Sequence, residues 1–352
     1  MMNLLWWPMS LGLVTSMILT PLTIVVFTKM GWVVDPSKLP HPGHTHKTPV
    51  PKGGGLPILG GILVVAFLCL PIDKHLSAIL IALALTILVG VIDDIKPLPP
   101  KLRLLTNLLA AGIVVSAGIG ISFITNPFGG TIDLTSPKIG FDLFGHHEIW
   151  LWPDIFALLW IPFVMNAVNW SSGTDGQATG VLAIAALVIG VLSLTFSADI
   201  TQWNVAILAF GLFGTLIPLT IFHFYPQKIM PGYGATTGVG LLLGVLSILS
   251  TTKIGTVIVV LGIPLIDAVY TIGRRVMAGK SPFLGDKGHL HHQMMAEGWG
   301  KRRIAFFYWT MTGFLGVIAL KFDAQTKIFA ILGIVLWLYF GVYSRRHDRG
   351  NG

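Results

Sequence analysis

The sequence predicts an all-α fold, a polytopic bundle of about eleven transmembrane helices forming one integral membrane domain over residues 1–352. Two observations lead to this class. The mean hydropathy is +0.78 and only 11% of the residues are charged, whereas a soluble domain has about 25%. The apolar residues also gather in repeated runs near the roughly 20 residues that cross about 30 Å of hydrocarbon as an α-helix.

Eleven apolar segments predict the spans in chain order. They cover residues 4–28, 54–72, 76–95, 102–124, 153–170, 178–197, 203–224, 234–251, 254–277, 304–320 and 327–344. The first run is long and has no small-residue cleavage site, so we expect a retained helix rather than a signal peptide. The sole cysteine, Cys69, lies inside an apolar run, which excludes a disulfide framework and a cysteine metal site.

Basic residues predict the orientation of these spans. With the N-terminus outside, the Lys and Arg residues that fall on the outer side are Lys74, Lys138, Lys253, Lys321 and Lys327, and the rest of the 23 fall inside. Cytoplasmic loops are enriched in Lys and Arg, so we expect an outer N-terminus and a cytoplasmic C-terminus. The net charge of +8 favours anionic partners, either lipid headgroups or substrate.

Polar motifs concentrate on one side of the membrane in this topology. Residues 125–152, on the outer side, carry alternating stretches that predict a small periplasmic hairpin. The motifs that suggest chemistry lie at inner loops or inner helix ends, in residues 46–55, 92–101, 166–176, 228–238, 264–267 and 285–292. The orientation is assigned from Lys and Arg alone. The clustering of Asp, Asn and His on the same side therefore indicates independently that the chemistry takes place on one side of the membrane.

Two of these motifs carry oxygen ligands. Asp93 and Asp94 end the apolar run ALALTILVGVI, where adjacent carboxylates repel unless a metal or another cation lies beside them. The alternative is that they simply end a helix at the interface. Asn166, Asn169 and Asp175 follow the fifth span and offer hard oxygen ligands suited to Mg²⁺. The same groups suit a nucleobase or a polar helix end.

The segment 274–303 is the long polar interruption in the second half of the chain. It places seven Lys and Arg residues around Asp286 and the cluster His289, His291 and His292. A loop that sets topology explains the cations, but cations together with imidazoles suit a phosphorylated substrate. Asp267 lies in the ninth span after Pro264, where a buried acid is either functional or structurally paired.

Taken together and in this order, the motifs resemble the polyprenyl-phosphate N-acetylhexosamine-1-phosphate transferase superfamily. The most specific parts are IDD at 92–94, NxxN and GxDG within 166–176, and GKSPF with DKGHLHH within 279–292. The HLHH form resembles the UDP-N-acetylglucosamine:undecaprenyl-phosphate N-acetylglucosamine-1-phosphate transferase branch. The resemblance implies transfer of an N-acetylhexosamine-1-phosphate from a UDP-sugar to polyprenyl (undecaprenyl) phosphate in the bacterial plasma membrane, with release of UMP, to initiate a cell-envelope glycan.

The resemblance also implies roles for individual residues. Asp93, Asp94 and His291 are expected to be catalytic, and Asp94 and Asn169 to bind Mg²⁺, or Mn²⁺ in its place. The residues expected to bind substrate are Lys52, Lys101, Asn166, Asp175, His289 and His292, with Asp175 at the position that contacts uracil. The expected partners are the UDP-sugar, polyprenyl phosphate and membrane lipid, without nucleic acid, and a homodimer is left open.

Two positions depart from the pattern of this superfamily. Ser172 stands where an Asp is usual, and Tyr233 is interpreted as replacing a metal-binding Asp, although a neutral phenol is a poor Mg²⁺ ligand. One alternative is therefore a divergent relative that binds substrate without turnover. A transporter is a further alternative, but it predicts acids deep in mid-membrane, whereas most acids here lie at inner helix ends.

Overall fold

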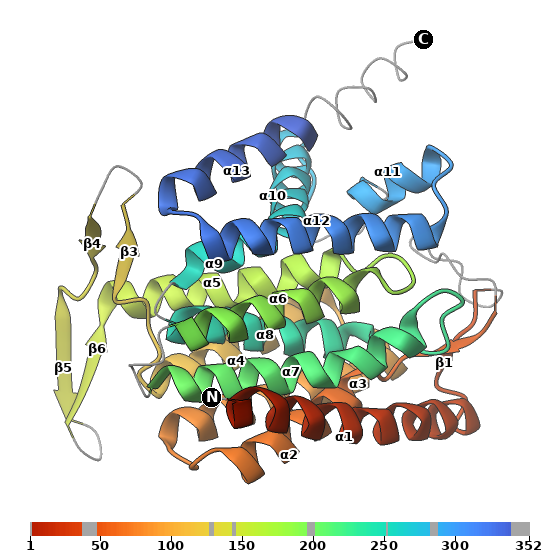
Figure 1. Ribbon diagram of the computed structural model, residues 1–352, viewed down its shortest axis with the longest axis horizontal. Helices are drawn as coiled ribbons and strands as arrows, with labels where there is room; N and C mark the ends of the chain where they lie inside the picture. Colours follow the sequence, from red (N-terminus) through yellow and green to blue (C-terminus); the bar gives the residue numbers. More distant parts are fainter. Residues whose placement is uncertain are drawn as a thin grey trace.

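The structure is a computed structural model that describes residues 2–36, 48–126, 130–142, 146–195, 201–250, 253–281 and 288–338. Long helices run side by side and form a layered bundle (Figure 1). Within the described ranges, seven helices are long and apolar enough to cross a membrane, or eight if a bent pair counts as one span. The all-α membrane class is confirmed, and the count of about eleven spans stays a prediction.

The helices follow the predicted apolar segments. They are α1 (Met2–Lys29), α2 (Gly55–Cys69), α3 (Lys74–Ile95), α4 (Pro100–Ser116), α5 (Leu151–Trp170), α6 (Gln177–Thr195), α7 (Thr201–His223), α8 (Gly232–Leu249), α9 (Lys253–Val260), α10 (Gly262–Met277), α11 (Leu290–Ala296), α12 (Lys301–Lys321) and α13 (Ala324–Leu338). The predicted ninth span is broken into α9 and α10, which meet at an angle of 85°. The short helix α11 carries the histidine cluster.

Local sequence signals set both ends of α3. Asp73 caps the start of the helix, because its Oδ1 accepts a hydrogen bond from Leu76 N at 2.7 Å. At the other end, α4 starts with Pro100, whose fixed φ and missing N–H suit the first helical position. The connection between α3 and α4 is therefore short, and it holds the acidic end of α3 against the first turns of α4.

Short strands lie at both ends of the bundle (Figure 1). The predicted periplasmic segment forms two antiparallel hairpins, β3 (Phe123–Thr125) with β4 (Thr131–Asp133) and β5 (Lys138–Asp142) with β6 (His146–Trp150). At the opposite end, β1 (Val33–Val34) pairs with β2 (Val50–Pro51), and Lys52 forms a bridge with Met230. This second contact ties the segment after α1 to the start of α8.

The helix α8 is deeply enclosed and packs against both α3 and α5. Gly90 of α3 and Gly234 of α8 approach so closely that a Cβ at Gly90 would overlap the Gly234 backbone. Small residues permit this kind of approach between membrane helices. The contact sets the acidic end of α3 against the first turn of α8.

We expect Gly90→Ala to lower the melting temperature of the protein in detergent. The new methyl group would meet backbone rather than a flexible side chain, and overpacking of this kind costs about 1–3 kcal/mol. Gly112→Ala on α4 is the matched control, since its Cβ would have nothing within 4 Å. Equal melting temperatures for the two variants would contradict the close α3–α8 contact.

Candidate active site

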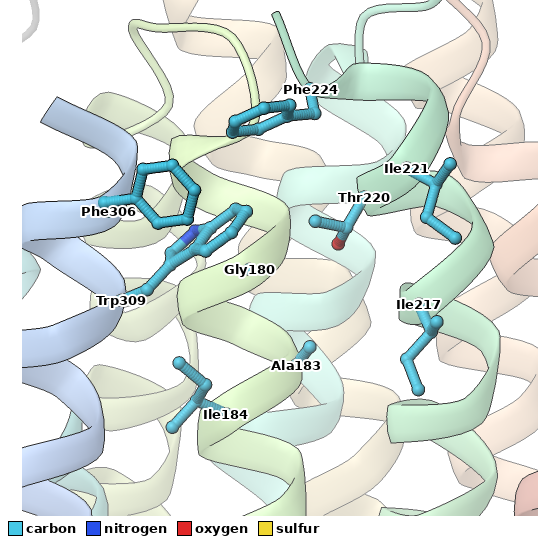
Figure 2. Close-up of a pocket in the computed structure, with 9 residues that line it drawn as sticks. All are labelled: Gly180, Ala183, Ile184, Ile217, Thr220, Ile221, Phe224, Phe306 and Trp309. Carbon is cyan, nitrogen blue, oxygen red and sulfur yellow. The ribbon is translucent and has the colours of Figure 1, made fainter. Parts of the chain in front are cut away.

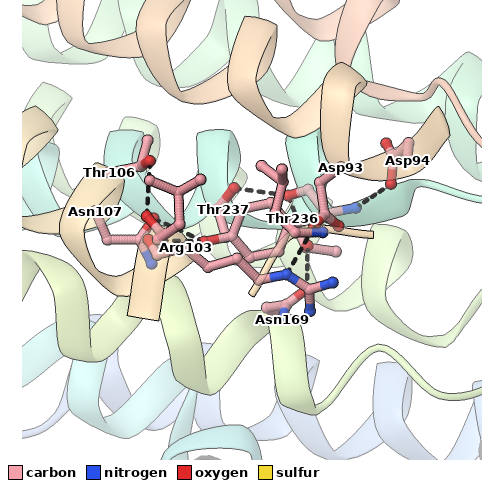
Figure 3. A network of polar contacts seen from close by, with 11 residues as sticks. Asp93, Asp94, Arg103, Thr106, Asn107, Asn169, Thr236 and Thr237 are labelled. Atoms are coloured by element: carbon pink, nitrogen blue, oxygen red, sulfur yellow. Dashed lines mark hydrogen bonds and ion pairs between the residues drawn. The ribbon is translucent and has the colours of Figure 1, made fainter. Parts of the chain in front are cut away.

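Asp94 lies at the end of α3 and faces the first turn of α8 (Figure 3). Its Oδ1 accepts a hydrogen bond from Tyr233 N at 2.8 Å. Its Oδ2 is buried and has no hydrogen-bond partner among the described residues. Gly232, with a φ of +71°, makes room for this oxygen, because a Cβ there would overlap it. A buried carboxylate oxygen without a partner is costly, so this atom is suited to a ligand that brings positive charge.

Asp93 is already neutralised by a residue of α4. Its Oδ1 accepts hydrogen bonds from Arg103 Nε at 2.6 Å and from Leu98 N at 2.9 Å (Figure 3). This ion pair reduces the repulsion between the two adjacent acids, because Asp93 is paired with a cation, whereas Asp94 keeps a buried oxygen without a partner among the described residues. From the sequence alone, Arg103 is only one of the basic residues that predict the orientation of the spans. The proline-rich turn between it and Asp93 is the signal that could have paired them.

The hydroxyl of Tyr233 is bound to α4 rather than to Asp94. Its hydroxyl lies 3.0 Å from Asn107 Oδ1 and 3.2 Å from Arg103 O, and the Arg103 guanidinium lies 5.3 Å from the ring centre. Only its backbone N–H serves Asp94. The side chain of Tyr233 thus anchors α8 to α4, and the residue facing Asp94 Oδ2 is Gly232. That Tyr233 replaces a metal-binding Asp stays a prediction.

Asn169 is held against the next turn of α8. Thr236 Oγ1 lies 2.8 Å from Asn169 Oδ1 and 2.9 Å from Gly232 O (Figure 3). Asp94 and Asn169 therefore contact neighbouring turns of one helix. Asn166 Nδ2 instead donates to Pro162 O at 2.7 Å, so this amide nitrogen is used within α5.

Asp175 follows in the turn between α5 and α6. It is 2% exposed, its Oδ1 lies 2.8 Å from Lys301 Nζ, and its Oδ2 accepts a hydrogen bond from Gln227 N at 3.4 Å. A nucleobase at this position would therefore meet an ion pair rather than a lone acid. Lys301 belongs to the polar segment 274–303, which the structure thus joins to the turn after α5.

The histidine cluster meets the same turn at Gly173. A Cβ at Gly173 would overlap the imidazole of His291, so the ring lies directly against the backbone. The rings of His289 and His291 are parallel within 4° at 5.8 Å, and His292 lies 4.3 Å from His291. His289 Nδ1 lies 2.7 Å from Asp267 Oδ2.

His291 is neutral at neutral pH. Burial and the neighbouring His292 lower the pKa of His291 to about 3, and its buried Nδ1 has no hydrogen-bond partner among the described residues. The neutral imidazole can therefore donate and accept hydrogen bonds with a substrate, but it does not supply a positive charge. Lys52 lies close enough to Asp94 for its ammonium group to interact electrostatically with the carboxylate. Lys101 is exposed at the start of α4.

Parts of the predicted motifs lie outside the described residues. They are residues 46–47 and 282–287, which include Lys47, Asp286 and Lys287. Among the residues that the structure does describe, Asp94, Asn169 and His291 are linked through Tyr233, Thr236 and Gly173. Asp94 and Asn169 thus contact neighbouring turns of α8, and His291 contacts the turn that follows Asn169. The convergence of these residues on one reacting group stays a prediction. Whether each residue has its predicted role stays a prediction.

A separate apolar cavity of about 440 Å³ lies between α6, α7 and α12 (Figure 2). Its lining residues are Gly180, Ala183, Ile184, Ile217, Thr220, Ile221, Phe224, Phe306 and Trp309. None of these lining residues has a titratable side chain. Its wall touches the turn after α5, because Trp309 Nε1 donates to Gly176 O at 3.1 Å.

The residues around Asp94 fit a Mg²⁺ ion that is completed by substrate. No group of three or more His, Cys, Asp or Glu that could hold a metal occurs in the described part of the chain. Asp94 nevertheless offers one carboxylate oxygen without a partner among the described residues, and the amide oxygen of Asn169, from α5, lies against the next turn of α8. Mg²⁺ is usually bound by one or two carboxylates together with waters and substrate phosphates.

The fold defines a multi-pass membrane protein with a cluster of polar residues at one end of its bundle. The sequence model of Glycosyl transferase family 4 matches residues 76–251, and the chain belongs to this family.

Curated relatives point to the same superfamily. The chain is 26% identical over 338 residues to the probable undecaprenyl-phosphate N-acetylglucosaminyl 1-phosphate transferase of Bacillus subtilis, covering 94% of this chain and 88% of that protein. It is 28% identical over 324 residues to the decaprenyl-phosphate N-acetylglucosaminephosphotransferase of Mycobacterium leprae, covering 82% and 76%. A phospho-N-acetylmuramoyl-pentapeptide-transferase of Staphylococcus epidermidis is 27% identical over 324 residues, covering 88% and 96%. The resemblance stated from the motifs is confirmed.

Proposed function

We propose that the protein transfers N-acetylglucosamine-1-phosphate from a UDP-sugar to a polyprenyl phosphate and releases UMP. The family and the names of the relatives support this reaction. The structural observation that carries it is the unpartnered Oδ2 of Asp94, which lies with Lys52 and Asn169 at one end of the bundle. Such a group suits two phosphorylated reactants and a cation between them.

In this reaction an oxygen of the polyprenyl phosphate attacks the phosphorus that carries the sugar. The new bond is P–O, the bond between this phosphorus and the bridging oxygen of the diphosphate breaks, and UMP leaves with that oxygen. A phosphate monoester has its second pKa near about 6, so the acceptor is mostly ionised at neutral pH. A strong general base is therefore unnecessary, which agrees with an Asp93 that is bound to Arg103.

Some of these side chains neutralise negative charge, and others orient the substrates. Asp94 and Asn169 would hold Mg²⁺, which when bound spreads the negative charge of the diphosphate. Lys52 adds a positive charge beside Asp94. The neutral imidazole of His291 hydrogen-bonds the donor, and in-line alignment of the reactants supplies much of the remaining acceleration.

We also propose that this end of the bundle faces the cytoplasm and that the N-terminus lies outside. The distribution of Lys and Arg over the predicted loops supports this orientation. The hairpins β3–β4 and β5–β6 lie at the opposite end (Figure 1). A homodimer stays a prediction.

The test uses the full chain in nanodiscs with undecaprenyl phosphate, Mg²⁺ and a panel of UDP-sugars. We expect UMP release and a lipid-linked product with UDP-N-acetylglucosamine, loss of both with EDTA, and recovery with Mg²⁺ or Mn²⁺. Absence of product with every sugar, together with measurable UDP-sugar binding, would support the alternative of an inactive relative. Turnover that is unaffected by EDTA would contradict the metal requirement.

A further inference from the structure

Asp267 is a buried acid that the proposed reaction does not use. It lies on α10, in the second turn after the break from α9, and is 2% exposed. A carboxylate in such a place is costly unless both oxygens find donors. The sequence leaves open whether this acid is functional or structurally paired.

Both oxygens of Asp267 are directed at the start of α11. Oδ2 lies 2.7 Å from His289 Nδ1, and Oδ1 accepts a hydrogen bond from Leu290 N at 2.9 Å. His289 is 6% exposed and Leu290 is fully buried. One carboxylate thus holds the side chain of the first histidine and the backbone from which the next two follow.

The contact with Asp267 determines which nitrogen of His289 carries the proton. An ionised carboxylate can only accept hydrogen bonds, so the nitrogen facing it must be Nδ1–H. The other ring nitrogen, Nε2, is then the one left for a ligand. A carboxylate that orients an imidazole in this way is a general device of catalytic and metal-binding histidines.

The orientation of His289 is passed on to the rest of the cluster. Its ring is parallel to that of His291, and His291 in turn lies against the backbone of Gly173. Rotation of the first ring would therefore displace the second, because no space separates it from the turn after α5.

We propose that Asp267 is a positioning residue: it holds His289 in the Nδ1–H tautomer, so that Nε2 faces the diphosphate of the sugar nucleotide, and keeps His291 in register against Gly173. This inference rests on the proposed function for the identity of the substrate. The tautomer and the ring positions rest on the contacts of Asp267 alone.

Asp267→Asn tests this assignment because the amide has the shape of the acid but only one acceptor. If its oxygen keeps the bond to Leu290 N, its NH₂ group faces His289 Nδ1, which must then lose its proton to Nε2. We expect the tautomer to switch and kcat/KM for UMP release to fall by about 10- to 100-fold. Asp267→Glu retains both acceptors and should keep the Nδ1–H tautomer and more activity than the Asn variant.

The tautomer is measured by ¹⁵N NMR on histidine-labelled protein in nanodiscs, with the His289 signals assigned by their loss in His289→Gln. Thr271→Val is the matched control. It lies one turn along α10 on the same face, is buried, and its hydroxyl has no hydrogen-bond partner among the described residues. We expect this variant to keep the wild-type tautomer and rate.

Activity supplies a second readout that a merely structural acid would not change. The kcat/KM lost in Asp267→Asn should be recovered in part by Asp267→Glu, which keeps an acceptor for both His289 Nδ1 and Leu290 N. An Nε2–H tautomer in the wild-type protein would overturn the proposal, as would an Asn variant with unchanged tautomer and rate. If wild-type protein releases no UMP, the proposed function fails, while the NMR result still decides the role of Asp267.

Discussion

Asp94→Asn should reduce the kcat of UMP release by at least about 10²- to 10³-fold, the range measured when one preorganised electrostatic group is removed from an active site. The amide can keep the bond from Tyr233 N to its oxygen. Its NH₂ group then occupies the place of the unpartnered Oδ2 and presents hydrogen atoms where a cation would bind. The charge is lost with little change in shape.

The melting temperature separates this effect from unfolding. We expect Asp94→Asn to be at least as stable as the wild type, because the substitution removes a buried and partly unsatisfied charge. Asp93→Asn is the comparison on the same helix end, and it should lower the melting temperature because it breaks the ion pair with Arg103. Wild-type turnover in Asp94→Asn, or an unchanged Mg²⁺ titration, would remove Asp94 from the mechanism.

The helices could be predicted because span length and apolar content are local properties. Even the break in the ninth span has a local signal, since Gly262 and Pro264 stand at the start of α10, where Pro is tolerated and a continuous helix is not favoured. The number of membrane crossings is harder to predict, because α2 and α13 are apolar but shorter than the other spans.

The candidate site was predictable in its members but not in its pairings. Asp94, Asn169 and His291 stand out by residue type in an apolar chain. Their partners come from other helices: Arg103 pairs with Asp93, Lys301 with Asp175, and Asp267 with His289. Such pairs depend on how the helices pack, and the distances between side chains on different helices cannot be derived from a single sequence. The position of Gly232 opposite Asp94 likewise depends on the α3–α8 contact.

Gly173→Ala should lower kcat/KM for the UDP-sugar by about 10²-fold, because misplacement of a binding group by about 1 Å can cost that much. The added methyl group would overlap the imidazole of His291. That ring is 1% exposed and is enclosed by the rings of His289 and His292, so it must rotate away from the turn. Gly313→Ala on α12 is the matched control, because its Cβ would have nothing within 4 Å.

A double-mutant cycle shows whether the loss passes through His291. His291→Ala alone removes the ring and should also weaken the sugar-nucleotide step. In the double variant the methyl group at position 173 has room, so its kcat/KM should equal that of His291→Ala rather than fall by the product of the two losses. Additive losses would mean that Gly173 acts through the backbone of the turn. In that case the contact between the turn after α5 and the histidine cluster would not contribute to the reaction.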